Sequence, residues 1–295
     1  MNINFELYKV FYHAARQLSF TRAAESLFVT QSSVSQSIKQ LETHLGALLF
    51  IRNRRNMQLT KEGEMLFFHV SEAYDLIKAG ERNIENTKTL GYGEVKIGAS
   101  DTICRYFLLD YIKRFHEDYP NIKISITNQP SMQTLEDIAG GKMDFGVVNL
   151  PESMRVKGVN VTEIKGFQEV AIATEACART LPAHPSIKDL TGVPLITLTP
   201  NTNTRRYLDT FFRSQKMTLA PEFELESIDL IVDFVRIGLG VGFVMADAIP
   251  AGDPVVRVLD LKETLPSRSI GIVTNKNSPL SIPTEHFMNV LIKGR

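Results

Sequence analysis

Hydrophobic residues in the first sixty positions recur at intervals of three and four, which is the spacing of amphipathic helices. The residues that would share the buried face of a first helix are Leu7, Val10, Phe11, Ala14, Ala15 and Leu18. Ser19 follows as a stop and as an N-cap for a second helix, which would bury Ala23, Ala24 and Leu27. The pattern therefore predicts short helices that pack on one another.

A third helix is predicted to begin after Thr30, a good N-cap, and to end at Gly46, which suits a left-handed C-cap. Its buried stripe would be Val34, Ile38, Leu41 and Leu45. The small Ala23 and Ala24 would let the second and third helices approach closely. Two short helices joined by a turn of this length match helix-turn-helix geometry.

The outward face of the third helix carries short or flat hydrogen-bonding side chains. Together with Thr30, this face is predicted to consist of Gln31, Ser32, Ser33, Ser35, Gln36 and Lys39. Such groups suit the base edges of a major groove, whereas a merely solvated helix more often carries Glu and Lys pairs. We expect these residues to bind double-stranded DNA.

Residues 49–60 contain two short extended runs around a basic tip, a pattern that predicts a β-hairpin wing. Arg52, Arg54 and Arg55 would then reach phosphates or a minor groove. The alternative is a solvated basic loop. The position of the hairpin directly after the three helices favours the wing.

Residues 62–88 lack proline and predict one long helix, capped by Thr60. Its apolar positions alternate steps of four and three, as in a coiled coil: Leu66, Val70, Ala73, Ile77, Gly80 and Ile84. Such a seam suggests a helix from a second copy of the chain. The alternative is that the helix packs on its own body.

Strand-like runs alternate with helical stretches over the remaining two hundred residues, which argues for an α/β architecture. The predicted strands are residues 94–99, 122–127, 145–149, 169–174, 195–199, 222–226, 242–245 and 269–274. The predicted helices are residues 102–118, 132–140, 204–215, 228–237 and 284–292.

Ligands of such sheets bind beyond the carboxyl ends of the strands, near helix N-termini. The polar residues at these positions are Ser100, Asp101, Thr102, Ser131, Gln133, Asn149, Thr199, Thr202 and Asn203. They suggest a site for a small anionic metabolite, although Asp101 would oppose an anion. The alternative for each residue is a simple helix cap or turn.

The formal net charge is zero, but its distribution is uneven. Residues 1–61 carry eight basic and three acidic side chains, a net +5, which leaves −5 for the rest. Chance could produce this over a short window. A basic head on an acidic body nevertheless fits a chain that presents one end to a polyanion.

Other functional classes find little support. The start of the chain does not resemble a signal peptide, and no run is apolar enough for a membrane helix, so we expect a cytoplasmic protein. Gly238, Gly240 and Gly242 precede a strand and lack dinucleotide-binding spacing. We expect no metal, no cofactor and no enzymatic activity. Redox sensing by Cys104, with or without Cys177, is a lesser alternative.

Residues 19–63 resemble the N-terminal signature of LysR-type transcriptional regulators. The matching segments are 19–27, 30–42, Leu45-Gly46, Leu49-Phe50, Arg52 and 59–63. The family often has Pro or Ala where this chain has Ser33, and Arg near Gln36. These departures remove a charge from the recognition helix and put the target sequence in doubt.

The resemblance implies an N-terminal all-α winged helix-turn-helix, residues 1–61, and a linker helix, residues 62–90, that dimerises. It further implies a C-terminal α/β effector domain, residues 91–295, that is like periplasmic binding proteins. This domain would comprise two Rossmann-like subdomains, residues 91–163 with 267–295 and residues 164–266. The leading cleft residues by resemblance are Ser100, Thr102, Ser131, Thr199 and Thr202.

The function that this organisation implies is a homodimeric or homotetrameric transcription regulator that responds to an effector in the cleft. RNA polymerase would be a further partner if the protein is an activator, and no membrane would be involved. The runner-up is a small-molecule-binding protein or enzyme with an incidental helical N-terminus.

Overall fold

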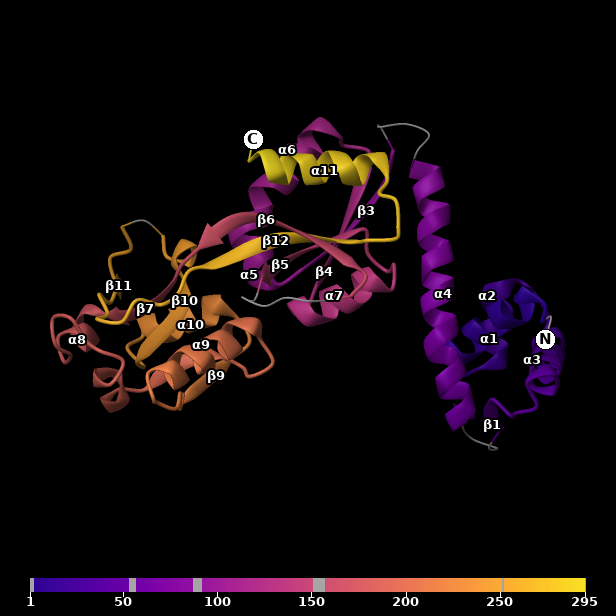
Figure 1. The fold of residues 1–295 in the computed structure, drawn as a ribbon, viewed down its shortest axis with the longest axis horizontal. Helices are drawn as coiled ribbons and strands as arrows, with labels where there is room; N and C mark the ends of the chain where they lie inside the picture. Colours follow the sequence, from indigo (N-terminus) through magenta and orange to yellow (C-terminus); the bar gives the residue numbers. More distant parts are fainter. Residues whose placement is uncertain (1–2, 53–56, 87–91, 151–156, 251, 295) are drawn as a thin grey trace. The chain divides into compact units, whose positions relative to one another are not determined.

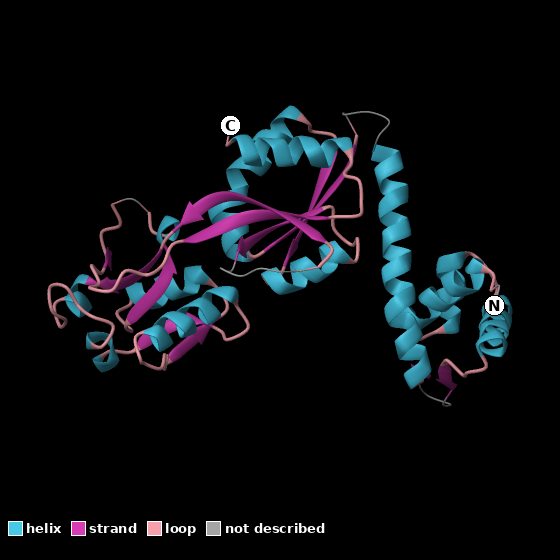
Figure 2. Cartoon of the chain, in the orientation of Figure 1, coloured by secondary structure: helices cyan, strands magenta, loops and turns pink. Residues whose placement is uncertain are grey.

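The computed structural model describes residues 3–52, 57–86, 92–150, 157–250 and 252–294. The chain divides into two compact units, and each is considered by itself. Figure 1 labels the elements, and Figure 2 shows that the first unit is mainly helical whereas the second contains two separate groups of strands.

The first unit opens with three helices, α1 (Phe5–Gln17), α2 (Phe20–Leu27) and α3 (Gln31–Leu45). Ser19 and Thr30 cap α2 and α3 by accepting from backbone amides, and Gly46 ends α3 in the left-handed region. Ala23 and Ala24 are buried between the helices. The predicted helices and caps are therefore confirmed, but Leu18, predicted to be buried, follows the end of α1 and is 45% exposed.

A two-stranded hairpin follows, made of β1 (Phe50–Arg52) and β2 (Met57–Leu59), so the predicted wing is present. Phe11 is fully buried, and its ring lies edge-on to Phe50 with centroids 5.7 Å apart. Burial of one such ring contributes roughly 1.5–3 kcal/mol, so this contact helps to attach the wing to the helices.

Helix α4 (Lys61–Asn86) begins where Thr60 Oγ1 accepts from the Gly63 amide at 2.9 Å. Leu66 and Val70, assigned from the sequence to an intermolecular seam, instead pack against the core of the helix-turn-helix. Further along α4, Ala73, Ile77, Gly80 and Ile84 are exposed. Exposed apolar positions of the predicted seam thus lie in this later part of the described helix.

The second unit contains two five-stranded mixed sheets. The first has the order β4-β3-β5-β12-β6. Its strands are β3 (Gly93–Ala99), β4 (Ile122–Asn128), β5 (Phe145–Leu150), β6 (Val159–Phe167) and β12 (Arg268–Asn275). Helices α6 (Leu109–Asp118) and α11 (Ile282–Lys293) cover one face, and α7 (Ser131–Ala139) covers the other (Figure 1).

The second sheet has the order β11-β7-β10-β8-β9. Its strands are β7 (Glu169–Thr174), β8 (Leu195–Leu198), β9 (Phe223–Leu225), β10 (Val241–Met245) and β11 (Val256–Val258). Helix α10 (Ile228–Arg236) packs on one face and α9 (Asn203–Ser214) on the other. A short α8 (Glu175–Ala178) follows β7, and 3-10 turns span Asp189–Gly192 and Ala246–Ala248.

The chain passes from the first sheet to the second through Gln168 alone, which separates β6 from β7. It returns through residues 259–267 into β12. The sequence reading had no strand over residues 159–167 or 256–258. Six of the nine residues of β6 are exposed, four of them in succession, so β6 lacks the alternating pattern by which a half-buried strand is recognised.

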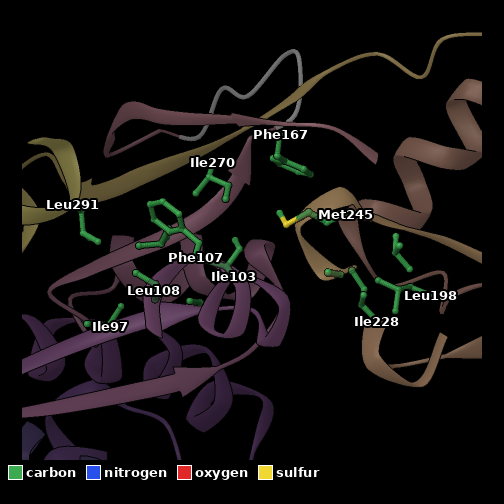
Figure 3. Close-up of a cluster of buried hydrophobic side chains, with 14 of the residues drawn as sticks. Ile97, Ile103, Phe107, Leu108, Phe167, Leu198, Ile228, Met245, Ile270 and Leu291 are labelled. Carbon is green, nitrogen blue, oxygen red and sulfur yellow. The ribbon is translucent and has the colours of Figure 1, made fainter. Parts of the chain in front are cut away.

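Buried side chains from both sheets join in one hydrophobic cluster. Ile103, Phe107 and Ile270 come from the side of the first sheet, and Leu198, Ile228 and Met245 from the side of the second (Figure 3). This cluster holds the two halves of the second unit together on the side of α10.

The glycines at residues 238–242 have a structural explanation. Gly240 has φ +152°, and a Cβ there would lie 2.1 Å from the Pro194 carbonyl oxygen. At Gly242, a Cβ would collide with Ile231 and Val235 of α10. The positive φ and the close approach of Pro194 therefore account for Gly240, and close packing of α10 on β10 accounts for Gly242.

We predict that Gly240→Ala destabilises the protein by about 2–4 kcal/mol, because it adds both backbone strain and a steric clash. Gly192→Ala is the matched control, since a Cβ there has no atom within 4 Å. Thermal melting of the full chain measures both variants. Equal melting midpoints would contradict the assigned role of Gly240.

Candidate functional site

The N-terminal half of α3 presents an accessible polar face. Gln31, Ser32, Ser33, Gln36 and Lys39 are exposed, as is the capping Thr30, whereas Ser35 is half-buried. All seven residues were predicted from the sequence. They lie along one side of the first turns of α3, with Thr30 at its N-cap. The buried Val34, Ile38 and Leu41 lie on the opposite side.

The hydroxyls at the start of α3 form a small network. Thr30 Oγ1 lies 2.9 Å from Ser32 Oγ and 2.8 Å from Ser33 Oγ, and accepts from the Ser33 amide at 3.2 Å. The network fixes the first turn of the helix, so the side chain of Gln31 leaves from a defined position. Ser33 therefore takes part in the N-cap of α3 and is also exposed on its polar face.

Glu42 sets the position of the wing relative to α3. Its Oε1 accepts from the amides of Leu49, at 2.8 Å, and Phe50, at 3.4 Å. The sequence analysis did not single out this residue. Arg52 ends β1 opposite Met57, while the predicted Arg54 and Arg55 lie outside the described residues.

In the second unit, the predicted ligand residues of the first sheet lie after the carboxyl ends of its parallel strands. Ser100 follows β3, Ser131 opens α7 after β4, and Asn149 is near the end of β5. Strand β3 pairs in parallel with both β4 and β5, so these ends share one edge of the sheet. Asn149 and Ser131 are buried, and Ser100 and Thr102 are half-buried.

Two predicted residues are engaged elsewhere. Asp101 is exposed, and its Oδ1 accepts from the side-chain amide of Asn128 at 3.3 Å. Gln133 is exposed and donates to Asp137, one turn further along α7, at 3.3 Å. The carboxylate of Asp101 thus has a partner on the neighbouring strand end.

The second sheet contributes the start of α9. Thr202 caps this helix by accepting from the Arg205 amide at 3.1 Å, and its hydroxyl donates to the Thr199 carbonyl at 3.0 Å. Asn203 Nδ2 donates to the Asn149 carbonyl oxygen at 3.4 Å. The structure thus brings together Asn149 and Asn203, two predicted residues from different sheets.

A buried ion pair lies where the chain crosses between the sheets. Arg268 Nη1 donates to Glu169 Oε1 at 2.6 Å and to Thr204 Oγ1 at 3.0 Å. The guanidinium lies 5.1 Å from the ring centroid of Phe167 and 4.8 Å from that of Tyr207. Burial raises the pKa of the Glu169 carboxyl, and Arg268 opposes this shift.

Polar contacts also join the sheets beside the hydrophobic cluster. Tyr106 lies in a π-helical turn, Cys104–Leu108, and donates to Asp229 Oδ1 at 2.5 Å. Arg105 approaches the same carboxylate at 3.2 Å, and Lys165 pairs with Asp247 at 2.5 Å. Burial and the bond to Asp229 raise the pKa of Tyr106 to about 12, so this hydroxyl remains a donor at neutral pH.

Sequence reasoning missed these contacts because their partners are far apart along the chain. Tyr106 and Asp229 are separated by 123 residues, and Arg268 and Glu169 by 99. The available signal for Glu169 was its position in an apolar strand, where an acidic residue needs a buried partner.

Cys104 is partly buried and is not paired with Cys177. Burial, and secondarily the charge of Asp101, raises the pKa of the Cys104 thiol to about 11. Burial also raises the pKa of Cys177. Redox sensors depend on an accessible thiolate, so these surroundings disfavour that role.

The two units therefore define a DNA-binding regulator that carries a separate small-molecule-sensing domain. Among the described residues, no helix combines the length and apolar character that crossing a membrane requires.

Comparison with known proteins gives the family. Residues 5–64 match the family described as "Bacterial regulatory helix-turn-helix protein, lysR family", and residues 90–294 match "LysR substrate binding domain". The chain belongs to the LysR-type transcriptional regulators. Its winged helix-turn-helix is a DNA-binding domain, and its periplasmic-binding-protein-like domain binds an effector, as the sequence predicted.

Relatives match over nearly the whole length. A "Probable RuBisCO transcriptional regulator" of Thalassiosira pseudonana is 28% identical over 292 residues, covering 96% of this chain and 95% of that protein. The uncharacterised regulator YfeR of Shigella flexneri is 26% identical, covering 99% of this chain and 94% of that protein.

Solved structures show the same fold. Full-length OxyR from Pseudomonas aeruginosa matches with a TM-score of 0.71 and 21% identity, covering 99% of this chain and 94% of that one. CbnR in complex with its target DNA matches with a TM-score of 0.55 and 17% identity, covering 99% of each chain.

We predict slow alkylation of Cys104 in a Cys177→Ser background. An ordinary thiol has a pKa of 9.0, whereas that of Cys104 is about 11, so less thiolate is present at any pH below both values. The rate should still rise about tenfold per pH unit up to about pH 9.5. Mass spectrometry measures it, with the denatured chain as control. A plateau near pH 7 would instead favour a redox role.

Proposed function

We propose that the residues of α3 read the sequence of the operator while the wing binds its backbone. The exposed polar face of α3 carries this proposal, because its groups can form hydrogen bonds with base edges. Gln31, Gln36 and Lys39 would contact bases, with Thr30, Ser32, Ser33 and Ser35 beside them. Arg52, with Arg54 and Arg55, would contact phosphates or a minor groove.

We further propose that the protein acts as a homodimer or homotetramer, with recognition helices in successive major grooves. The exposed Ala73, Ile77, Gly80 and Ile84 of α4 support pairing with a second copy. A second candidate surface is a groove of about 610 Å³ over α6 and β4. Leu109, Ile112, Ile122 and Ile124 line it together, and such a grouped apolar surface suits contact with another chain.

The effector would bind between the two sheets of the second unit, at the ends of β3, β5 and β8 and the start of α9. The proposed ligand residues remain Ser100, Asp101, Thr102, Ser131, Gln133, Asn149, Thr199, Thr202 and Asn203. Asp101 and Gln133 would belong to the rim, since both are exposed and have partners. A small anionic metabolite suits the positive end of the α9 dipole.

The remaining features of the proposal follow from this assignment. The domain limits are residues 1–61, 62–90 and 91–295. The protein works without catalysis, in the cytoplasm, where its DNA partner is, and contacts RNA polymerase if it activates transcription. Effector binding would change the contacts between the sheets, such as that of Tyr106 with Asp229, and so shift the population of subunit arrangements.

We predict that Gln31→Ala lowers sequence discrimination, costing about 1–3 kcal/mol on the operator and little on unrelated DNA. The operator is first selected from random duplexes by the unaltered protein, and dissociation constants are then measured by gel shift. His44→Ala, in the last turn of α3, is the control. An unchanged ratio of the two dissociation constants would refute the placement of Gln31.

Arg52→Ala should weaken binding to operator and unrelated DNA alike, and should reduce the slope of log affinity against log salt by about one. Titrations at several salt concentrations measure this slope. Lys293→Ala, an exposed charge of the second unit, should leave it unchanged. A loss confined to the operator would instead make Arg52 a base-reading residue.

A further inference from the structure

The buried arginines near the proposed effector site are already neutralised. Arg205 and Arg268 are the buried arginines of the described chain. Arg268 pairs with Glu169, and Arg205 pairs with Glu224 at 2.5 Å and Asp209 at 3.1 Å. A ligand that is only an anion would therefore find no unpaired buried guanidinium here.

Within the described part of the chain, three buried side-chain atoms lack a hydrogen-bond partner: Ser100 Oγ, Asn149 Oδ1 and Glu169 Oε2. Asn149 is 6% exposed and Glu169 is 2% exposed, so water contributes little to either. An amide oxygen and a carboxylate oxygen only accept hydrogen bonds. Two of the three atoms are thus available to a donor from another molecule, since leaving a buried acceptor unpaired is costly. At Glu169 the Thr204 hydroxyl beside the carboxyl is a competing donor, so Asn149 Oδ1 is the clearer of the two acceptors.

Asn149 and Glu169 both lie close to the start of α9. Asn203 binds the main chain of Asn149, and the adjacent Thr204 binds the guanidinium that holds Glu169. The first amides of α9 precede its first internal hydrogen bond, which runs from the Arg206 amide to the Thr202 carbonyl. Amides and the helix dipole suit a carboxylate. Asn203 and Thr204 therefore bring free amide donors next to the residues that carry the two acceptors.

We propose that the effector is a small carboxylic acid that carries a hydroxyl or ammonium donor beside its carboxylate. This inference rests on the proposed effector site. The carboxylate accepts from the first amides of α9, and the donor faces Asn149 Oδ1 and Glu169 Oε2. Ser100 Oγ donates to or accepts from either group. An acid without the donor leaves the acceptors unpaired, and sites of this type reject such analogues strongly.

The test uses the full chain and three matched probes, butyrate, 2-hydroxybutyrate and 2-aminobutyrate, which differ only in the group beside the carboxylate. Isothermal titration should show that at least one donor-bearing acid binds about tenfold or more tightly than butyrate. Whichever of 2-hydroxybutyrate and 2-aminobutyrate binds more tightly shows whether the effector is a hydroxy acid or an amino acid.

Variants of the acceptor tie the preference to this site. Asn149→Leu should abolish the preference over butyrate, whereas Asn149→Asp keeps an acceptor and should retain it. Asn160→Leu, at an exposed position of strand β6, is the matched control and should change nothing. Melting midpoints without ligand and gel shifts establish that each variant folds.

The proposal is overturned if butyrate binds as tightly as its derivatives, if none of the three acids binds, or if Asn149→Leu keeps the preference. Its failure is distinguishable from failure of the proposed function. If butyrate or inorganic phosphate binds and a Ser100→Ala variant loses it, the effector site stands and only the donor requirement falls.

Discussion

The positive charge of Arg268 has to be balanced inside the protein, because its side chain is buried where the chain crosses between two sheets. Glu169 supplies the balance from the first residue of β7, directly after the crossing at Gln168. Phe167 and Tyr207 enclose the guanidinium, and Thr204 takes a further hydrogen bond. One cation therefore connects both crossing segments with the start of α9.

This arrangement bears on the proposed effector site. Since Glu169 and Arg268 neutralise one another, recognition at that site would rest on hydrogen bonds. In the proposal, the start of α9 supplies donors, while Asn149 and Glu169 supply acceptors. On the other side, Tyr106 and Asp229 join the same two sheets next to the hydrophobic cluster. Because these contacts join the same two sheets, a ligand that alters one of them would also affect the others.

The DNA-binding half was predictable in detail because its determinants are local. Ser19, Thr30 and Gly46 cap helices within four residues of their own position, and the period of Val34, Ile38 and Leu41 fixes which side of α3 is buried. Once that side is fixed, Gln31 and Gln36 must face outward. The predicted seam of α4 was wrong in its first part for the opposite reason. Leu66 and Val70 have the right spacing, but spacing does not say which partner covers them.

The sequence by itself thus determined the helices, most strands and the strand ends where the proposed ligand residues lie, since local geometry and hydrophobic period set these features. Tertiary structure decided which polar residues are left with unmet hydrogen-bonding capacity. Arg205 and Arg206 are neighbours in the chain, yet one is buried against Glu224 and the other is exposed. Asn149 keeps a buried unpaired oxygen, whereas Asp101 is exposed and accepts from Asn128. Such differences arise from partners brought together across many residues, which no local pattern encodes.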